Sequence, residues 1–193
     1  TINQLSPVVD NTDPLRIYSG NPDLKTEYIH DASLGFYLFD NFSFTNLFSR
    51  VTARLTNDKI TNTLSFDDNL RQVISPTNID EDWFASTYLS FGTPIKQFGI
   101  KTHISYNGSY NKTQLLNNGI QNNVERYSQS IDVNVENRKK NAVDIRMGYK
   151  IEWNTTLFSG ASELNQDYQR HVSYTDVTID FLKTWQVKSP FDY

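Results

Sequence analysis

Hydrophobic and polar residues alternate with a period of two along much of this chain. In the clearest segment, every second residue from position 143 to 153 is apolar and the residues between them are mostly charged or small: Val143, Ile145, Met147, Tyr149, Ile151 and Trp153. A β-strand sends successive side chains to opposite faces, whereas a helix repeats about every 3.6 residues. The segment therefore predicts a strand with one apolar and one polar face.

Other segments repeat this alternation. Residues 98–107 and 127–136 show it strongly, and residues 28–38, 42–55, 83–91 and 176–181 show it more loosely. Within 42–55 the apolar residues change parity, and a β-bulge would explain this change. The segments amount to about seven strands of nine or more residues, longer than the ~5–6 residues of a usual strand. The predicted fold is an all-β antiparallel meander of about seven long strands.

The expected connections are of two alternating kinds. Short turns are predicted at residues 40–41, 93–97, 137–141 and 187–190, and long polar loops at residues 57–82, 108–126 and 154–171. Long amphipathic strands with short turns at one end and long loops at the other are typical of an outer-membrane barrel, a closed β-barrel that crosses the bilayer. A soluble β-sandwich or lipocalin-like binding module, with its apolar faces buried in a shared core, shows the same alternation and stays as the alternative.

Composition narrows the choice. The longest apolar run is about five residues, which excludes a transmembrane helix of ~18 residues. The chain has no cysteine, so disulfides, cysteine zinc sites and thiol nucleophiles are excluded, and its net charge of -4 gives no basis for nucleic-acid binding. The mean hydropathy is only -0.56, but in a barrel only alternate residues face lipid.

The first 26 residues differ from the rest and are predicted to be an irregular, proline-rich lead-in to a single domain of barrel strands at 27–193. From Gln4 to Glu27 they read QLSPVVDNTDPLRIYSGNPDLKTE. This segment resembles a phrase that precedes a strand in the Bacteroidetes-type outer-membrane β-barrel of TonB-dependent receptors. Thr26 stands where that phrase usually has proline.

The resemblance implies a location in the outer membrane and a role in nutrient transport. It implies a barrel of roughly twenty-two strands with a plug domain inside it, and import energised through TonB. The partners would be outer-membrane lipid, an unknown nutrient ligand, the plug domain and TonB. Because about seven strands cannot close such a barrel, we expect the chain to be a fragment, and we expect the isolated fragment to self-associate through its open edges.

No arrangement of residues predicts catalysis, so we expect neither an enzyme nor a cofactor. His30, His103 and His171 are scattered, and the acidic residues at 67–68 and 80–82 lack the glycine-centred spacing of a calcium loop. No nucleophile-elbow, phosphate-loop or dinucleotide-binding motif occurs. A metal site is therefore not predicted.

Ligand binding is the remaining chemistry, and the amide-rich loop at 108–126 is its best candidate. Its amides and aromatic rings could form hydrogen bonds with, or stack on, a glycan or peptide. Asparagine is also a good turn former, which would explain the same composition. The candidate binding residues are Tyr110, Asn117, Asn118, Asn122 and Asn123, with Gln121 and Tyr127 nearby.

Overall fold

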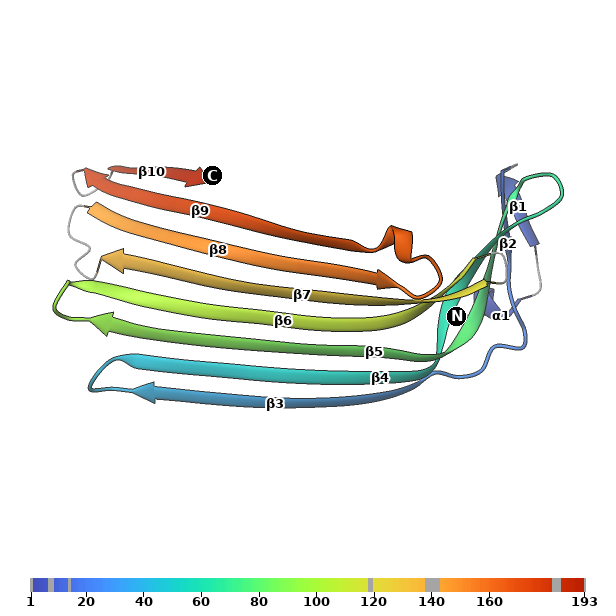
Figure 1. The fold of residues 1–193 in the computed structure, drawn as a ribbon, viewed down its shortest axis with the longest axis horizontal. Coiled ribbons are helices and arrows are strands. Elements are labelled where there is room, and N and C mark those ends of the chain that lie inside the picture. The colour runs from blue at the N-terminus through green and yellow to red at the C-terminus, as the bar shows by residue number, and fades with distance from the viewer. Residues whose placement is uncertain are drawn as a thin grey trace.

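The computed structural model describes residues 2–6, 9–13, 15–117, 120–137, 143–181 and 185–192 of the chain. Long strands lie side by side in one extended sheet (Figure 1). They are β3 (Tyr28–Asp40), β4 (Thr45–Phe66), β5 (Gln72–Ile95), β6 (Ile100–Asn117), β7 (Ile120–Asn137), β8 (Val143–Phe158), β9 (Gln166–Phe181) and β10 (Trp185–Asp192). Each pairs antiparallel with the next strand in sequence, so the predicted all-β meander is confirmed.

The register of these pairs places like residues on the same face. Leu89 on β5 lies opposite Tyr106 on β6, Tyr106 lies opposite Ile131 on β7, and Ile131 lies opposite Ile151 on β8. Directly opposite residues point to the same side of a sheet. One side is therefore an apolar face running across all these strands, and the other is a polar face.

The apolar face is open to its surroundings. Leu34 is 74% exposed and Met147 is 51% exposed, and many other large apolar side chains of this face exceed a third. Within the described part of the chain, Ile79 and Val124 are the only buried hydrophobic residues. The apolar faces do not meet in a shared core, so the alternative of a soluble sandwich or lipocalin-like module is wrong.

The height of the apolar face matches a membrane. Val143 and Trp153 on β8 are separated by ten residues, or about 34 Å along the strand at ~3.4 Å each. At a tilt of ~40° this is about 26 Å along the membrane normal, close to the ~25 Å apolar band of outer-membrane barrels. Tyr110 and Tyr127 pair near one end of this face, and Trp83 and Trp153 lie two residue pairs from them in the register. These positions fit an aromatic girdle at one membrane interface.

The strands extend well beyond their predicted ends. Most residues of the predicted loops at 57–82, 108–126 and 154–171 belong to strands, and the described connections at this end shrink to residues 67–71 and 159–165. A ladder of backbone hydrogen bonds does not require apolar side chains. The strand ends above the apolar band are polar and show no alternation, so their sequence resembles that of loops.

The turns also differ from prediction. The turn predicted at 93–97 lies at 96–99, because residues 93–95 belong to β5. Residues 187–190 lie inside β10 and pair with β9. Residues 41–44 form the turn between β3 and β4, and Phe44 adopts a positive φ of 57° there. The parity change expected to mark a bulge is thus a turn, because Phe42 and Phe44 precede β4. The predicted turn at 137–141 falls largely outside the described residues.

The far halves of β4 and β5 form a hairpin that extends beyond the sheet (Figure 1). The β4–β5 register holds from Asn46↔Gly92 to Phe66↔Gln72. In the main sheet β5 lies between β4 and β6, whereas the far end of β4 contacts β6 through the pair Leu64↔Asn117. The hairpin therefore twists as it leaves the wall, which places its tip beyond the ends of the central strands.

The lead-in is not irregular as predicted. It holds a short helix α1 (Ile2–Leu5) and the strands β1 (Val9–Asp13) and β2 (Arg16–Ser19). β2 adds in parallel to the far half of β5, from Arg16↔Gln72 to Tyr18↔Ile74. These short strands were missed because so few residues show no readable period.

The glycine-asparagine-proline phrase fastens the lead-in to this hairpin. A Cβ on Gly20 would lie 2.0 Å from the carbonyl oxygen of Ser6, so only glycine fits there. The Asn21 side-chain amide donates a hydrogen bond to the Pro76 carbonyl at 3.1 Å. The segment following the phrase continues this attachment through the side chain of Asn78.

Asn78 joins three backbone groups. Its Oδ1 accepts the Lys25 N–H at 2.8 Å, and its Nδ2 donates to the carbonyls of Lys25 at 3.0 Å and Asp58 at 2.6 Å. Asp58 is the point on β4 with a positive φ of 51°, where the hairpin leaves the wall. Asn78 thus ties the lead-in to the base of the hairpin.

We expect Asn78→Ala to release the lead-in locally without unfolding the wall. Each lost hydrogen bond contributes about 1 kcal/mol, so hydrogen exchange at the Lys25 amide should accelerate about tenfold or more. Amide exchange followed by mass spectrometry measures this. Asn69→Ala, on the same hairpin, is the control, because the Asn69 side chain makes no hydrogen bond within the described residues. Equal exchange rates at Lys25 in the two variants would contradict the assignment.

Candidate functional site

The polar face carries two neighbouring rows of side chains that cross the sheet. The first row runs through consecutive pairs from β4 to β9: Arg50, Tyr88, Asn107, Ser130, Glu152 and Arg170. The second row runs beside it: Thr52, Ser86, Ser109, Ser128, Asn154 and Tyr168. Together they line most of a hollow of about 460 Å³.

Side-chain size explains the shape of this hollow. The floor consists of serines and one asparagine from the central strands, and the larger Tyr88 and Tyr168 stand on opposite sides of it. A row of small side chains flanked by large ones leaves a depression in an otherwise even sheet surface. The hollow is consequently lined by hydroxyl, amide and charged groups.

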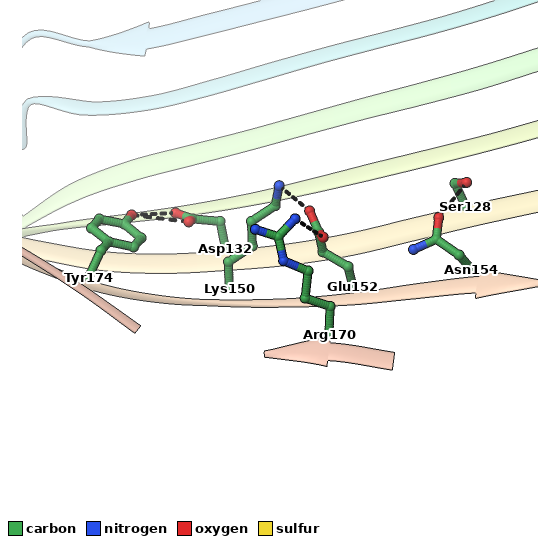
Figure 2. A network of polar contacts seen from close by, with 7 residues as sticks. All are labelled: Ser128, Asp132, Lys150, Glu152, Asn154, Arg170 and Tyr174. Atoms are coloured by element: carbon green, nitrogen blue, oxygen red, sulfur yellow. Dashed lines mark hydrogen bonds and ion pairs between the residues drawn. The ribbon is translucent and has the colours of Figure 1, made fainter. Parts of the chain in front are cut away.

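An ion-pair network occupies one side of the hollow (Figure 2). Glu152 accepts Lys150 Nζ at 2.5 Å and lies 3.6 Å from a guanidinium nitrogen of Arg170. Beside it, the Ser128 hydroxyl donates to Asn154 Oδ1 at 2.7 Å. One carboxylate therefore faces two cations on this side, which leaves the network with a positive balance.

Tyr174 forms a second contact further along the polar face (Figure 2). It lies opposite Gly148 in the register, and a Cβ on Gly148 would come within 2.2 Å of the tyrosine ring. The missing side chain lets Tyr174 reach across β8 to β7, where its hydroxyl donates to the Asp132 carboxylate at 3.0 and 3.1 Å. The contact fixes three neighbouring strands relative to one another.

One row of the polar face near the short turns is balanced in charge. Lys101, Glu136, Arg146 and Asp176 follow one another across β6 to β9, and their charges alternate in sign. Lys101 and Glu136 form an ion pair at 3.4 Å. The hollow and this alternating row therefore differ, since only the hollow carries an excess of one sign.

The tip of the β4–β5 hairpin is held by one carboxylate. Asp67 Oδ1 accepts the backbone N–H groups of Asn69 and Arg71, both at 2.9 Å, and Oδ2 pairs with the Arg71 guanidinium at 2.7 Å. The Arg71 N–H and its side chain hold the pKa of Asp67 below its usual value. This turn is ordered by its own side chains and offers little spare bonding capacity to a ligand.

The candidate ligand residues do not gather in a loop as predicted. Tyr110 lies on β6 on the apolar face, with its ring centroid 4.9 Å from that of Tyr127. Asn122 Oδ1 accepts the Gly160 N–H at 2.8 Å and the Ser159 hydroxyl at 3.2 Å. These two residues thus have structural roles, in the aromatic girdle and in shaping the β8–β9 connection.

The other three candidates are tested less fully. The backbone N–H of Asn123 donates to Ser159 Oγ at 2.9 Å, and Asn123 lies on β7. Asn117 is the last residue of β6, its side chain lies outside the described part, and Asn118 lies outside it altogether. The prediction that the candidates form a loop cluster is wrong for the four that lie on strands: Tyr110, Asn117, Asn122 and Asn123. The role of the candidate residues in ligand binding stays a prediction.

The residues of the hollow were not singled out from sequence. Each is an ordinary polar residue on an alternating strand, and only the register of six strands brings them together. The available signal was parity, because Asn107, Ser128 and Glu152 all occupy the polar positions of their strands. Odd or even position along a strand predicts which face a residue lies on, but not which residues of neighbouring strands lie opposite it.

The described residues show neither a metal site nor a membrane-spanning helix. Among them, no group of three or more histidine or acidic side chains is arranged to hold a metal ion. In the same residues no helix has the length and apolar character needed to cross a bilayer.

A long antiparallel wall with an open apolar face of membrane height and a polar opposite face defines an outer-membrane barrel protein. The chain belongs to the outer membrane protein beta-barrel family, which it matches over residues 1–185. It is located in the outer membrane, where the apolar face contacts lipid and the polar face lines the barrel interior. No curated protein and no solved structure matches the chain.

We expect Gly148→Ala to displace the Tyr174 ring and break its hydrogen bond to Asp132. The free energy of unfolding should fall by about 1–3 kcal/mol, as for other insertions into packed sites. Urea unfolding of the purified protein in lipid vesicles, followed by tryptophan fluorescence, measures it.

Gly35→Ala serves as the control, because the nearest atom to its new Cβ would be the Ser49 carbonyl oxygen at 3.9 Å. This variant should stay within about 0.5 kcal/mol of the unchanged protein. The assignment of Tyr174 fails if the two alanine variants unfold at the same urea concentration.

Proposed function

We propose that this chain forms part of the barrel wall and the extracellular ligand-binding surface of a TonB-dependent transport receptor for nutrient uptake. The observation that carries the proposal is the polar hollow on the interior face of a membrane-spanning wall. A wall that only enclosed packed side chains would not need such a depression. The proposal involves no catalytic step and no cofactor.

The position of the hollow supports a role in ligand capture. Ser86 is three residues from Trp83 in the aromatic girdle and nine residues from Ile95 at the short-turn end of β5. In outer-membrane barrels the long connections face the cell exterior and the short turns face the periplasm. The hollow therefore lies in the outer part of the interior, where an incoming solute arrives first.

The lead-in supports the TonB-dependent class. The segment from Gln4 to Glu27 resembles the phrase of these receptors, and its Gly20 and Asn21 make contacts that other residues would not reproduce. In this proposal the remaining strands of the receptor pair with the outer edges of β3 and β10. The plug domain and TonB are then partners of the complete receptor.

Uptake measured in cells tests the proposed function. A strain lacking this protein should fail to grow on one nutrient supplied at limiting concentration, and a plasmid copy should restore growth. A strain lacking TonB should lose growth on the same nutrient, because transport against a gradient requires energy from the inner membrane. Accumulation of the radiolabelled nutrient gives the quantitative readout in both strains.

Two results would overturn the proposal. Unchanged accumulation in the strain lacking TonB would mean that the protein is a passive channel. Unchanged growth of the strain lacking this protein on every carbon, iron and cofactor source supplied would mean that it is not a nutrient receptor.

A further inference from the structure

Arg50 lines the hollow and differs from Arg54 and Arg170, which lie on the same polar face. Within the described residues its guanidinium has neither an ion-pair nor a hydrogen-bond partner. Arg54, four residues further along β4 on the same face, pairs with Asp31, and Arg170 pairs with Glu152. Arg50 therefore presents an uncompensated positive charge to the hollow.

The surrounding charges add to that of Arg50. Lys150 and Arg170 share the single carboxylate of Glu152, as described above. Arg126 lies on the polar face of β7 two residues before Ser128, and within the described part of the chain it too has no side-chain partner. Around the hollow there are thus two carboxylates, Glu152 and Asp132, and four cations: Arg50, Arg126, Lys150 and Arg170. A concave wall with this balance attracts an anion.

The floor of the hollow offers hydrogen bonds that the protein does not use. The side chains of Ser86, Asn107, Ser109 and Ser130 have no hydrogen-bond partner among the described residues. Each can both donate and accept. Such a set suits a ligand that carries several hydroxyl groups.

Size and shape restrict the ligand further. A volume of about 460 Å³ lies in the lower half of the ~300–1,000 Å³ range of small-molecule sites. Tyr88 and Tyr168 stand on opposite sides, and the face of a tyrosine ring can stack on the apolar side of a sugar ring. The hollow has room for one or two sugar units.

We propose that the hollow binds a small hydroxylated anion, a sugar acid or a sugar phosphate. Its carboxylate or phosphate pairs with the planar guanidinium of Arg50, which suits two parallel hydrogen bonds to such a group. Its hydroxyl groups bond to the serine and asparagine side chains of the floor. This inference deepens the proposed function by naming the substrate class, and it rests on that function only for the solute's entry into the barrel.

Binding to the purified full-length protein in detergent tests the proposal by isothermal titration calorimetry. The probes are glucose, glucose 6-phosphate and glucuronate, so that the two anions differ from glucose by a phosphate and by a carboxylate at the same carbon. We expect at least one anion to bind at least tenfold more tightly than glucose, and its identity tells phosphate from carboxylate. Its affinity should fall as sodium chloride is raised, because screening weakens the charge interaction.

Arg50→Gln should weaken binding of that anion about tenfold or more, because a charge-assisted pair is lost. Arg50→Lys, which keeps the charge but not the planar fork, should retain an intermediate affinity. Arg54→Gln is the matched control, because Arg54 already pairs with Asp31. The affinity of the Arg54→Gln variant for the anion should stay within twofold of that of the unchanged protein. Circular dichroism of each variant shows that the barrel has formed.

The proposal is overturned if none of the three probes binds, if glucose binds as tightly as both anions, or if Arg50→Gln and Arg54→Gln bind the anion equally. None of the three probes would bind if an acidic segment of another domain filled the hollow. Because the assay needs no TonB, it separates the two claims. Anion binding together with TonB-independent uptake contradicts the proposed function and leaves the ligand class standing.

Discussion

The in-phase register of the hydrogen-bond ladder is the constraint on which the rest of this structure depends. Every pair from β3 to β9 keeps alternating residues in step, so that apolar residues share one face over seven strands. A slip of one residue in any pair would turn that strand's apolar side chains to the interior. The same register that forms the lipid-facing surface also assembles the rows of the hollow from separate strands.

The strands crossing the membrane were predictable because lipid imposes a period on the sequence. The alternation at residues 143–153 lies inside β8, and the alternation at 127–136 lies inside β7. Above the membrane this constraint disappears, because both faces of a strand meet water. The far halves of β4 and β5 therefore carry no readable period, although their backbone ladder is unbroken apart from the bend at Asp58.

The binding surface was less predictable than the fold. Composition drew attention to the asparagines near residue 120, yet Asn122 bonds within the β8–β9 connection and Tyr110 lies on the lipid side. The hollow instead depends on which polar residues are small and which arginines lack a partner within the described residues. Both properties belong to neighbours across strands, such as Arg50 beside Tyr88, and they emerge only when the register is known.

The assignment of the two faces is tested most directly by cysteine labelling in the outer membrane, since the chain has no cysteine of its own. Single cysteines replace Ser109, Ser128, Ile131 and Ile145, and a small negatively charged thiol reagent is applied to intact cells. Cysteines at the two serine positions should react, and those at the two isoleucine positions should react only after detergent dissolves the membrane. Equal labelling at all four positions, or labelling at the isoleucine positions alone, would contradict the account.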